Sequence, residues 1–132
     1  MAPSEIRTRT ARLYMRPDGI VVSSNFLNAG EQKLIDAKEN IQALVTLAGS
    51  GRVPLYLDTP APMEEKARKY YLSSAQHLLA AAMLASDMFS RVLANLLIPF
   101  QGAPVPMKLF ATEEGAIAWL HKNMAAAKGE PR

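Results

Sequence analysis

Cysteine is absent from this chain of 132 residues. The absence excludes disulfide bonds, thiolate nucleophiles and thiolate metal ligands, and it is typical of proteins from reducing compartments. Histidine is scarce: neither His77 nor His121 is spaced with carboxylates as a zinc or iron site requires. There is also no glycine-rich phosphate loop, GxSxG elbow or paired-carboxylate motif. The sequence therefore indicates a protein that is not an enzyme and that holds no metal or cofactor.

Long hydrophobic runs are missing as well. The most apolar stretch covers residues 78–85, whereas a membrane-spanning helix needs about 20 such residues. The basic residues near the start are not followed by an apolar segment that could form the core of a signal peptide. We therefore expect a cytoplasmic protein without a transmembrane segment.

Charge of one sign is only slightly in excess. The formal net charge is +3, and the basic residues are dispersed, with most of the excess near the two ends of the chain. No motif combines aromatic and basic side chains in the way that nucleic-acid-binding modules do. We therefore expect no nucleic-acid partner.

The composition is that of one ordinary globular domain, with 49% hydrophobic and 20% charged residues. We predict a single domain over residues 1–132, with flexible termini at 1–8 and 125–132. Residues 10–16 and 20–24 favour strands, and the intervening Pro17-Asp18-Gly19 suits a tight turn, so the domain is predicted to open with a β-hairpin.

A first helix is predicted after the hairpin. Asn28 and Glu31 are spaced as in a capping box, and Gly49 is suited to end the helix. Its buried face is predicted from the apolar periodicity, which selects Leu34, Ile35, Ile41, Leu44, Val45 and Ala48.

The second half of the chain alternates predicted strands and helices. Residues 53–58 form a buried strand, and a helix begins near Pro62, with Glu64–Arg68 and Glu65–Lys69 spaced to form ion pairs. Residues 78–85 are predicted to be a strand, because one helix from 67 to 98 would be about 48 Å long at 1.5 Å per residue, too long for a domain of this size. A helix at 87–98, a strand at 105–110 and a helix starting at Thr112 complete the chain.

This order, ββαβαβαβα, is typical of an α/β domain. Alternating strands and helices imply a mainly parallel sheet joined by right-handed crossovers. The predicted fold therefore consists of an N-terminal β-hairpin, a mainly parallel sheet and four helices.

Several segments also carry a family resemblance. They are residues 53–58 (VPLYLD), 67–71 (ARKYY), 90–92 (SRV), 106–110 (PMKLF) and 114–120 (EGAIAWL). In these segments the chain resembles the STAS-like, SpoIIAA-like domains, and more closely a group of small uncharacterised bacterial proteins with that fold. The resemblance implies the fold of anti-sigma-factor antagonists and of the cytoplasmic domains of sulfate transporters.

The resemblance also implies a departure from the antagonists' mechanism. In those proteins a strand ending in Asp leads into a helix whose first residues carry a serine that a kinase phosphorylates. Asp58 matches the strand end, but the helix start reads MEEKA over residues 63–67 and has no hydroxyl. We therefore expect no phosphorylation switch here, although Glu65 supplies a permanent negative charge.

Two functions remain open from the sequence. The first is a non-enzymatic, STAS-like partner-binding or regulatory domain. It is predicted to form a homodimer through the apolar helix at 87–98 and to bind an unknown protein partner through surfaces around the second and third helices. The alternative is a protein that binds a small apolar ligand or lipid, which this helix and the adaptable side chains of Met83, Met88 and Met107 favour.

The candidate binding site is predicted at the carboxyl ends of the strands. Parallel sheets bring loops and helix N-termini together at this edge, where free amides favour small polar or anionic ligands. The residues predicted there are Asp58, Thr59, Ser86, Ser90 and Arg91.

Overall fold

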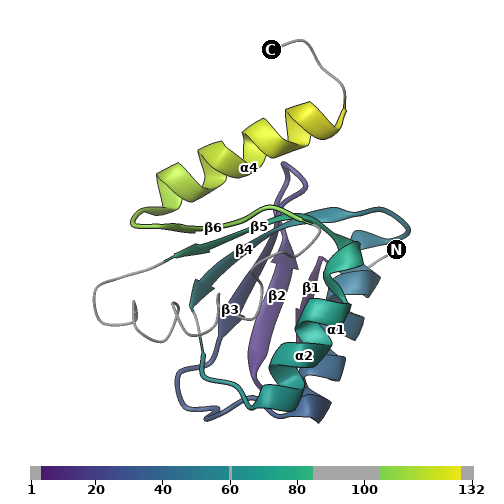
Figure 1. Ribbon diagram of the computed structural model, residues 1–132, viewed down its shortest axis with the longest axis vertical. Coiled ribbons are helices and arrows are strands. Elements are labelled where there is room, and N and C mark those ends of the chain that lie inside the picture. Colours follow the sequence, from purple (N-terminus) through teal and green to yellow (C-terminus); the bar gives the residue numbers. More distant parts are fainter. Residues whose placement is uncertain (1–3, 60, 85–104, 129–132) are drawn as a thin grey trace.

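The structure, a computed structural model, describes residues 4–59, 61–84 and 105–128 (Figure 1). Its elements in chain order are β1 (Glu5–Arg7), β2 (Ala11–Met15), β3 (Val21–Asn25), α1 (Leu34–Ala48), β4 (Val53–Thr59), α2 (Glu65–Ser73), a 3₁₀ turn (Ala75–His77), β5 (Leu78–Leu84), β6 (Met107–Phe110) and α4 (Glu113–Ala127). The predicted α/β class is therefore confirmed.

The described strands form one sheet whose spatial order follows the chain order, β1-β2-β3-β4-β5-β6. Strands β1, β2 and β3 pair antiparallel, while β3 to β6 pair parallel. The predicted hairpin is present as β2 and β3. Its turn requires glycine at Gly19, where φ is 90°.

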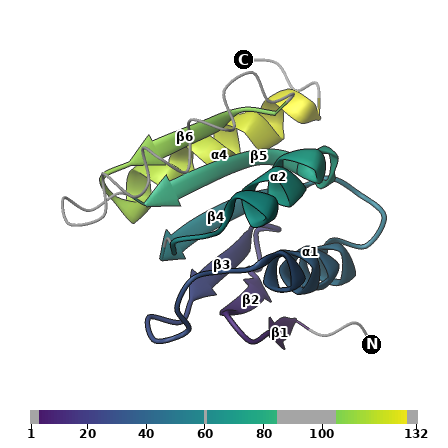
Figure 2. The same ribbon diagram turned by 60° about the horizontal axis from the view of Figure 1, so that its bottom comes forward.

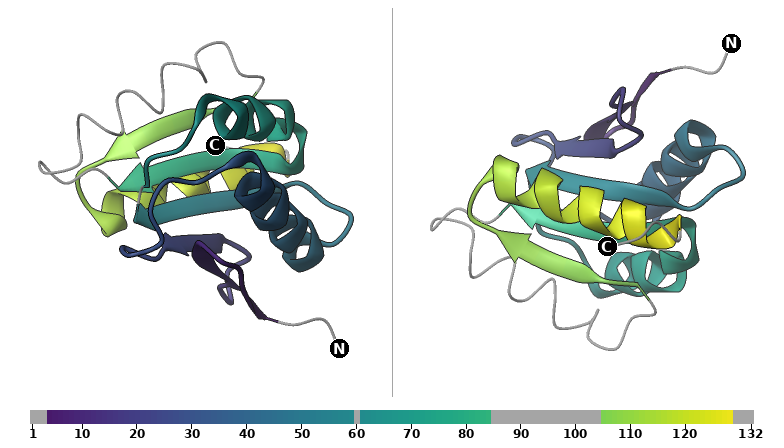
Figure 3. Two further views of the ribbon diagram at one scale, coloured as in Figure 1. Left: turned by 90° about the horizontal axis from the view of Figure 1, so that it is seen from below. Right: turned by 90° about the horizontal axis from the view of Figure 1, so that it is seen from above.

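Helices cover both faces of the sheet. Helix α1 packs on β1, β2 and β3, α2 packs mainly on α1, and α4 packs on β4, β5 and β6. Figures 2 and 3 show α1 and α2 together on one face and α4 on the opposite face. The sheet therefore separates two apolar cores, one under α1 and one under α4.

Strand β5 supplies alternating residues to the two cores. Ala81 belongs to the core under α1, while Ala80 and Ala82 belong to the core under α4. The 3₁₀ turn separates this strand from α2. The prediction of a strand here, instead of one long helix, is confirmed over Leu78–Leu84.

The start of α1 differs from the prediction. The helix begins at Leu34, and the backbone N–H of Lys33 donates to Asp36 Oδ2 at 2.8 Å. Residues 28–32 stay outside the helix because Gly30 has a φ of 77° and Gln32 pairs with Met63 through a parallel bridge. Asn28 and Glu31 therefore do not form the capping box that their spacing suggests.

The buried face of α1 also differs from the predicted one. Leu44 is buried as predicted, but Ile35 is 75% exposed. The other buried positions are Asp36, Ala37, Asn40, Ala43 and Leu47. This stripe has helical spacing but includes two polar residues. Apolar periodicity alone missed it because the partners of Asp36 and Asn40 lie in another part of the chain.

Two elements reach into the segments that were predicted to be termini. Residues 5–7, expected to be part of a flexible terminus, form β1, in which Glu5 pairs with Arg12 of β2 at 2.6 Å. Helix α4 extends to Ala127, beyond the predicted start of a C-terminal tail at residue 125. Cross-strand pairing and helix continuity account for the additional order, and neither has a strong local sequence signal.

The remaining predicted elements have different outcomes. Glu65 pairs with Lys69 at 3.4 Å as predicted, but Glu64 Oε2 accepts a hydrogen bond from the Leu34 backbone N–H instead of pairing with Arg68. Thr112 caps α4 as predicted, accepting from the Gly115 N–H at 3.1 Å. The predicted helix at 87–98 lies outside the described residues.

Tyr56 places a polar atom in the core under α4. The residue is 1% exposed, and its hydroxyl has no hydrogen-bond partner among the described residues. Burial raises the pKa of Tyr56 to about 12, with the charges of Glu113 and Asp58 adding to the effect. An unpaired buried hydroxyl is unfavourable, because folding removes its hydrogen bonds to water without replacing them.

Tyr56→Phe is therefore expected to raise the free energy of unfolding by about 1 kcal/mol, since it removes the unpaired hydroxyl and keeps the ring. Urea denaturation of the two proteins measures the difference. A variant less stable than the natural protein would show that the hydroxyl has a favourable contact.

Candidate functional site

A cavity of about 100 Å³ lies between α1, α2 and the sheet. The cavity forms because α2 packs mainly against α1 and not against the sheet. Strand β5 also places the small Ala81 on the sheet face that lies under α1. Ala81 lies between Leu55 of β4 and Met107 of β6 in the strand register. The residues that line the cavity are Leu13, Ser23, Asn25, Gln32, Asn40, Ile41, Leu44, Leu55, Leu57, Ala61, Met63, Tyr71, Ser74, Leu78, Ala81, Met83 and Met107.

Most of the cavity wall is apolar. Leucines from three strands and from α1 contribute to it, together with Met63, Met83 and Met107. Methionine side chains are unbranched and polarisable, so they adapt to different shapes. This wall can therefore accommodate an apolar group without a strict fit.

One part of the wall is polar and is built by Asn25, Gln32, Asn40 and Tyr71. Gln32 Nε2 donates to Asn25 Oδ1 at 3.1 Å, and the Tyr71 hydroxyl donates to Gln32 Oε1. Asn40 Nδ2 lies 3.0 Å from both the Tyr71 hydroxyl and Thr10 Oγ1. Burial raises the pKa of Tyr71 to about 12, so its hydroxyl stays protonated near neutral pH.

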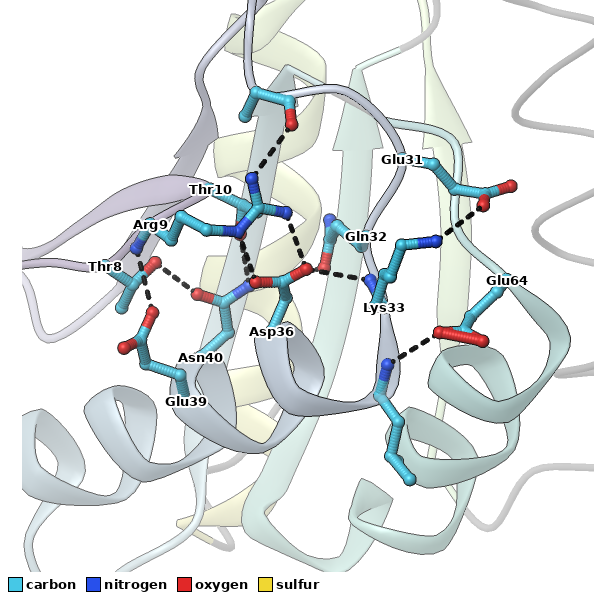
Figure 4. Close-up of polar contacts among 12 residues, drawn as sticks. Thr8, Arg9, Thr10, Glu31, Gln32, Lys33, Asp36, Glu39, Asn40 and Glu64 are labelled. Carbon is cyan, nitrogen blue, oxygen red and sulfur yellow. Dashed lines mark hydrogen bonds and ion pairs between the residues drawn. The ribbon is translucent and has the colours of Figure 1, made fainter.

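The polar wall is supported from the turn between β1 and β2 (Figure 4). The Thr8 hydroxyl donates to Asn40 Oδ1 at 2.5 Å. The guanidinium of Arg9 donates to both carboxylate oxygens of Asp36 at 2.7 Å, and to the Ala29 carbonyl at 3.1 Å. These contacts fix the first turns of α1 and with them the position of Asn40 at the cavity.

The Arg9–Asp36 pair makes stability dependent on pH. The hydrogen bonds from Arg9 hold the pKa of the buried Asp36 carboxyl below its ordinary value of 3.8. A carboxyl whose pKa is lower in the folded state stabilises the fold above its unfolded pKa, and this contribution is lost as the pH falls through the folded pKa.

Asp36→Asn is therefore expected to be less stable than the natural protein near neutral pH, with the difference shrinking as the pH falls below 3.8. Asparagine keeps an oxygen for the Lys33 N–H, but it loses the charge and one of the two acceptors for Arg9. Urea denaturation over a pH series measures it. A difference that stays constant down to acid unfolding would contradict this assignment.

The predicted site residues are placed only in part. Asp58 and Thr59 end β4, where the Thr59 hydroxyl donates to Asp58 Oδ1 at 2.9 Å. The Thr59 carbonyl accepts from Asn25 Nδ2 at 2.6 Å, which puts this strand end beside the polar wall. Neither residue lines the cavity, and Ser86, Ser90 and Arg91 lie outside the described residues.

Other chemistry is sparse in the described part of the chain. His121 Nε2 lies 2.9 Å from Asp18 Oδ2 and links α4 to the hairpin turn. No group of three or more His, Asp or Glu side chains is arranged to hold a metal ion within residues 4–59, 61–84 and 105–128. In the same residues, no helix is long and apolar enough to cross a membrane.

Comparison with known proteins places the chain in a family. A family described as a domain of unknown function, DUF7793, matches residues 9–124. The chain belongs to this family. The residues that line the cavity of this DUF7793 domain, from Leu13 to Met107, all fall within the matched range. None of the curated proteins matches the chain.

Solved structures show the fold of the DUF7793 domain. An uncharacterised protein of the DUF3478 family with a SpoIIAA-like fold, from Shewanella loihica PV-4, has a TM-score of 0.60 and 12% identity, over 83% of this chain and 91% of the other. A protein of unknown function from Arthrobacter sp. FB24 is 25% identical over 83% of this chain and 97% of its own, with a TM-score of 0.31. The first likeness confirms the predicted SpoIIAA-like fold.

Proposed function

We propose that this domain binds a small molecule with a largely apolar body in the cavity between α1, α2 and the sheet. The observation that carries the proposal is the cavity itself, about 100 Å³ in volume and lined mainly by leucine and methionine. About 10–15 Å³ of such volume holds one water molecule, so the space suits a ligand of a few non-hydrogen atoms.

A binding role accounts for the cavity better than a packing defect does. Protein interiors are packed to crystal-like density, and an apolar void loses dispersion contacts on every wall. A ligand restores those contacts. Methionines at three points of the wall allow the space to adjust to the ligand.

The lining favours binding over catalysis. None of the described lining residues is a carboxylate, histidine, lysine or arginine, so the cavity offers no strong general acid or base. The Tyr71 hydroxyl is held in hydrogen bonds with Gln32 and Asn40. We therefore propose a ligand-binding domain without enzymatic activity, and the lack of cysteine supports a cytoplasmic location.

Methyl-labelled methionine provides the test by NMR. On titration with isohexane, the methyl signals of Met63, Met83 and Met107 are expected to shift and to saturate, because these side chains line the cavity. Met15 and Met124 belong to the apolar clusters but do not line the cavity, so they serve as internal controls. Signals that do not shift, or equal shifts at Met15 and Met124, would contradict the proposal.

Binding to a protein partner is the second candidate function, and one observation favours it. Leu27, in the loop after β3, is 82% exposed and Ile35 of α1 is 75% exposed. Leu27 precedes α1, and Ile35 lies in its first turn. The segments just before α1 and α2 pair through the Gln32–Met63 bridge. Contiguous exposed apolar patches mark protein–protein interfaces. We propose that Leu27 and Ile35 belong to such a patch and that a second copy of the chain is the partner.

Sedimentation velocity tests the homodimer. The natural protein is expected to sediment as a dimer at micromolar concentration, and a Leu27→Ser/Ile35→Ser variant as a monomer with the same fold by circular dichroism. A monomeric natural protein, or a variant that still dimerises, would contradict an interface at these two residues.

A further inference from the structure

The hydrogen-bond directions in the polar wall are fixed by one backbone carbonyl. The Thr59 carbonyl can only accept, so the atom of Asn25 that lies 2.6 Å from it must be the amide nitrogen. Asn25 Oδ1 then faces Gln32 and must accept, which assigns the nearby atom of Gln32 as Nε2. Gln32 Oε1 is thereby directed to the Tyr71 hydroxyl, which donates to it.

Two side-chain N–H donors of this wall have no acceptor among the described residues. Asparagine and glutamine each carry two N–H donors. Within the described residues, Asn25 Nδ2 donates only to the Thr59 carbonyl and Gln32 Nε2 only to Asn25 Oδ1, so each retains a second N–H. The side-chain oxygens already accept, since Gln32 Oε1 receives Tyr71 and also lies 3.3 Å from Asn40 Nδ2. A ligand that complements this wall must therefore bring an acceptor.

The acceptor must also be uncharged. The described lining contains no cationic side chain, and Arg9 on the neighbouring turn is already paired with Asp36. A carboxylate moved from water into such a site loses its hydration without gaining a counter-ion, which is costly. A carbonyl oxygen loses far less and regains a hydrogen bond.

We infer that the ligand carries an uncharged carbonyl, such as that of a ketone, ester or amide, which accepts hydrogen bonds from the side chains of Gln32 and Asn25. Its apolar part lies toward Ala81, Met83 and Met107. This inference rests on the proposed function and specifies the ligand class for the same cavity.

Three ligands test the inference: methyl propyl ketone, butyrate and isohexane. Their non-hydrogen atoms, oxygens included, form the same branched skeleton. Methyl propyl ketone is expected to bind and to move the side-chain amide proton signals of Gln32 and Asn25 downfield, because a carbonyl accepts from them. Isohexane is expected to bind without those shifts. Butyrate is expected to bind at least about tenfold more weakly than the ketone, because the described lining residues offer its charge no counter-ion.

Gln32→Met, close to isosteric, removes the donor. It is expected to weaken binding of the ketone, relative to binding of isohexane, about three- to tenfold, the value of one ordinary hydrogen bond. Tyr71→Phe is the matched control, since it removes a hydroxyl from the same network but keeps the Gln32 donor. Isohexane binding shows in each variant that the cavity is intact.

The failures of the two proposals are distinguishable. If the ketone and isohexane bind but no amide signal of Gln32 or Asn25 responds, or if butyrate binds as tightly as the ketone, the carbonyl inference is wrong and the ligand-binding function stands. If none of the three ligands binds the natural protein, both proposals are wrong. The amide signals are read on the natural protein, so the test holds even if Gln32→Met does not fold.

Discussion

Replacing Asn40 by leucine is expected to lower the free energy of unfolding by about 3 kcal/mol, although leucine is the better helix former and the more apolar residue. Asn40 is buried on α1, and its amide contacts Thr8, Thr10 and Tyr71. Leucine would remove a partner of the buried Thr10 hydroxyl and one partner each of the partly buried Thr8 and Tyr71 hydroxyls. A buried polar group that loses its partner costs about 1–3 kcal/mol. Urea denaturation measures the loss.

Ile35→Ser is the matched control on the same helix. Ile35 is 75% exposed, so its replacement is expected to change stability by no more than about 0.5 kcal/mol. Residue type alone would predict that replacing the apolar Ile35 lowers stability more than replacing the polar Asn40. The structure predicts the opposite order. Equal losses in the two variants, or a larger loss for Ile35→Ser, would contradict the buried stripe of α1.

Leucine substitutions at Ala81 and Ala82 are expected to have opposite effects, although the two residues are adjacent on β5. Ala82 is fully buried in the core under α4, against Ala116 and Leu120, so a larger side chain there is expected to cost about 1–3 kcal/mol of stability or more. Ala81 faces the cavity, where the added carbons occupy empty space and restore dispersion contacts.

Ala81→Leu is accordingly expected to be as stable as the natural protein or more stable, and to lose binding of isohexane. Denaturation and the methionine methyl signals give the two measurements on the same samples. Similar destabilisation of both variants would mean that the face under α1 and α2 has no room at Ala81. Full isohexane binding by Ala81→Leu would place the ligand elsewhere.

Local signals in the sequence account for the elements that were predicted correctly. Pro17, Asp18 and Gly19 define the hairpin turn, Gly49 ends α1, and Thr112 caps α4. Strand β5 was predicted against its helix-favouring composition, because the length of the alternative helix is incompatible with a domain of this size. All of these signals come from neighbouring residues or from chain length.

Long-range hydrogen bonds account for what the sequence did not reveal. Asp36 and Asn40 are four residues apart on one face of α1, but they are buried only because Thr8, Arg9 and Thr10 reach them from a turn nearly 30 residues earlier. Polar residues at such positions are usually exposed. The four-residue spacing was the only local signal, and it is common on solvent-facing helices.

The proposed cavity has other residues than the site predicted at the carboxyl ends of the strands, and that site stays a prediction. Thr59 contacts the polar wall only through its backbone carbonyl, because its hydroxyl donates to Asp58. Asn25 and Gln32 provide the side-chain amides of the wall. The cavity itself depends on how α2 packs against α1, which no local pattern specifies. Met83 and Met107, noted in the sequence for an apolar ligand, do line it.

A crystal structure of the natural protein under xenon pressure tests the central claim most directly, because xenon occupies apolar cavities without requiring a specific contact. The account predicts xenon density bounded by Leu55, Ala81 and Met107, with no comparable density in the core under α4. A structure in which this space contains no xenon, or is filled by side chains from residues 85–104, would contradict the claim that the domain holds a ligand cavity.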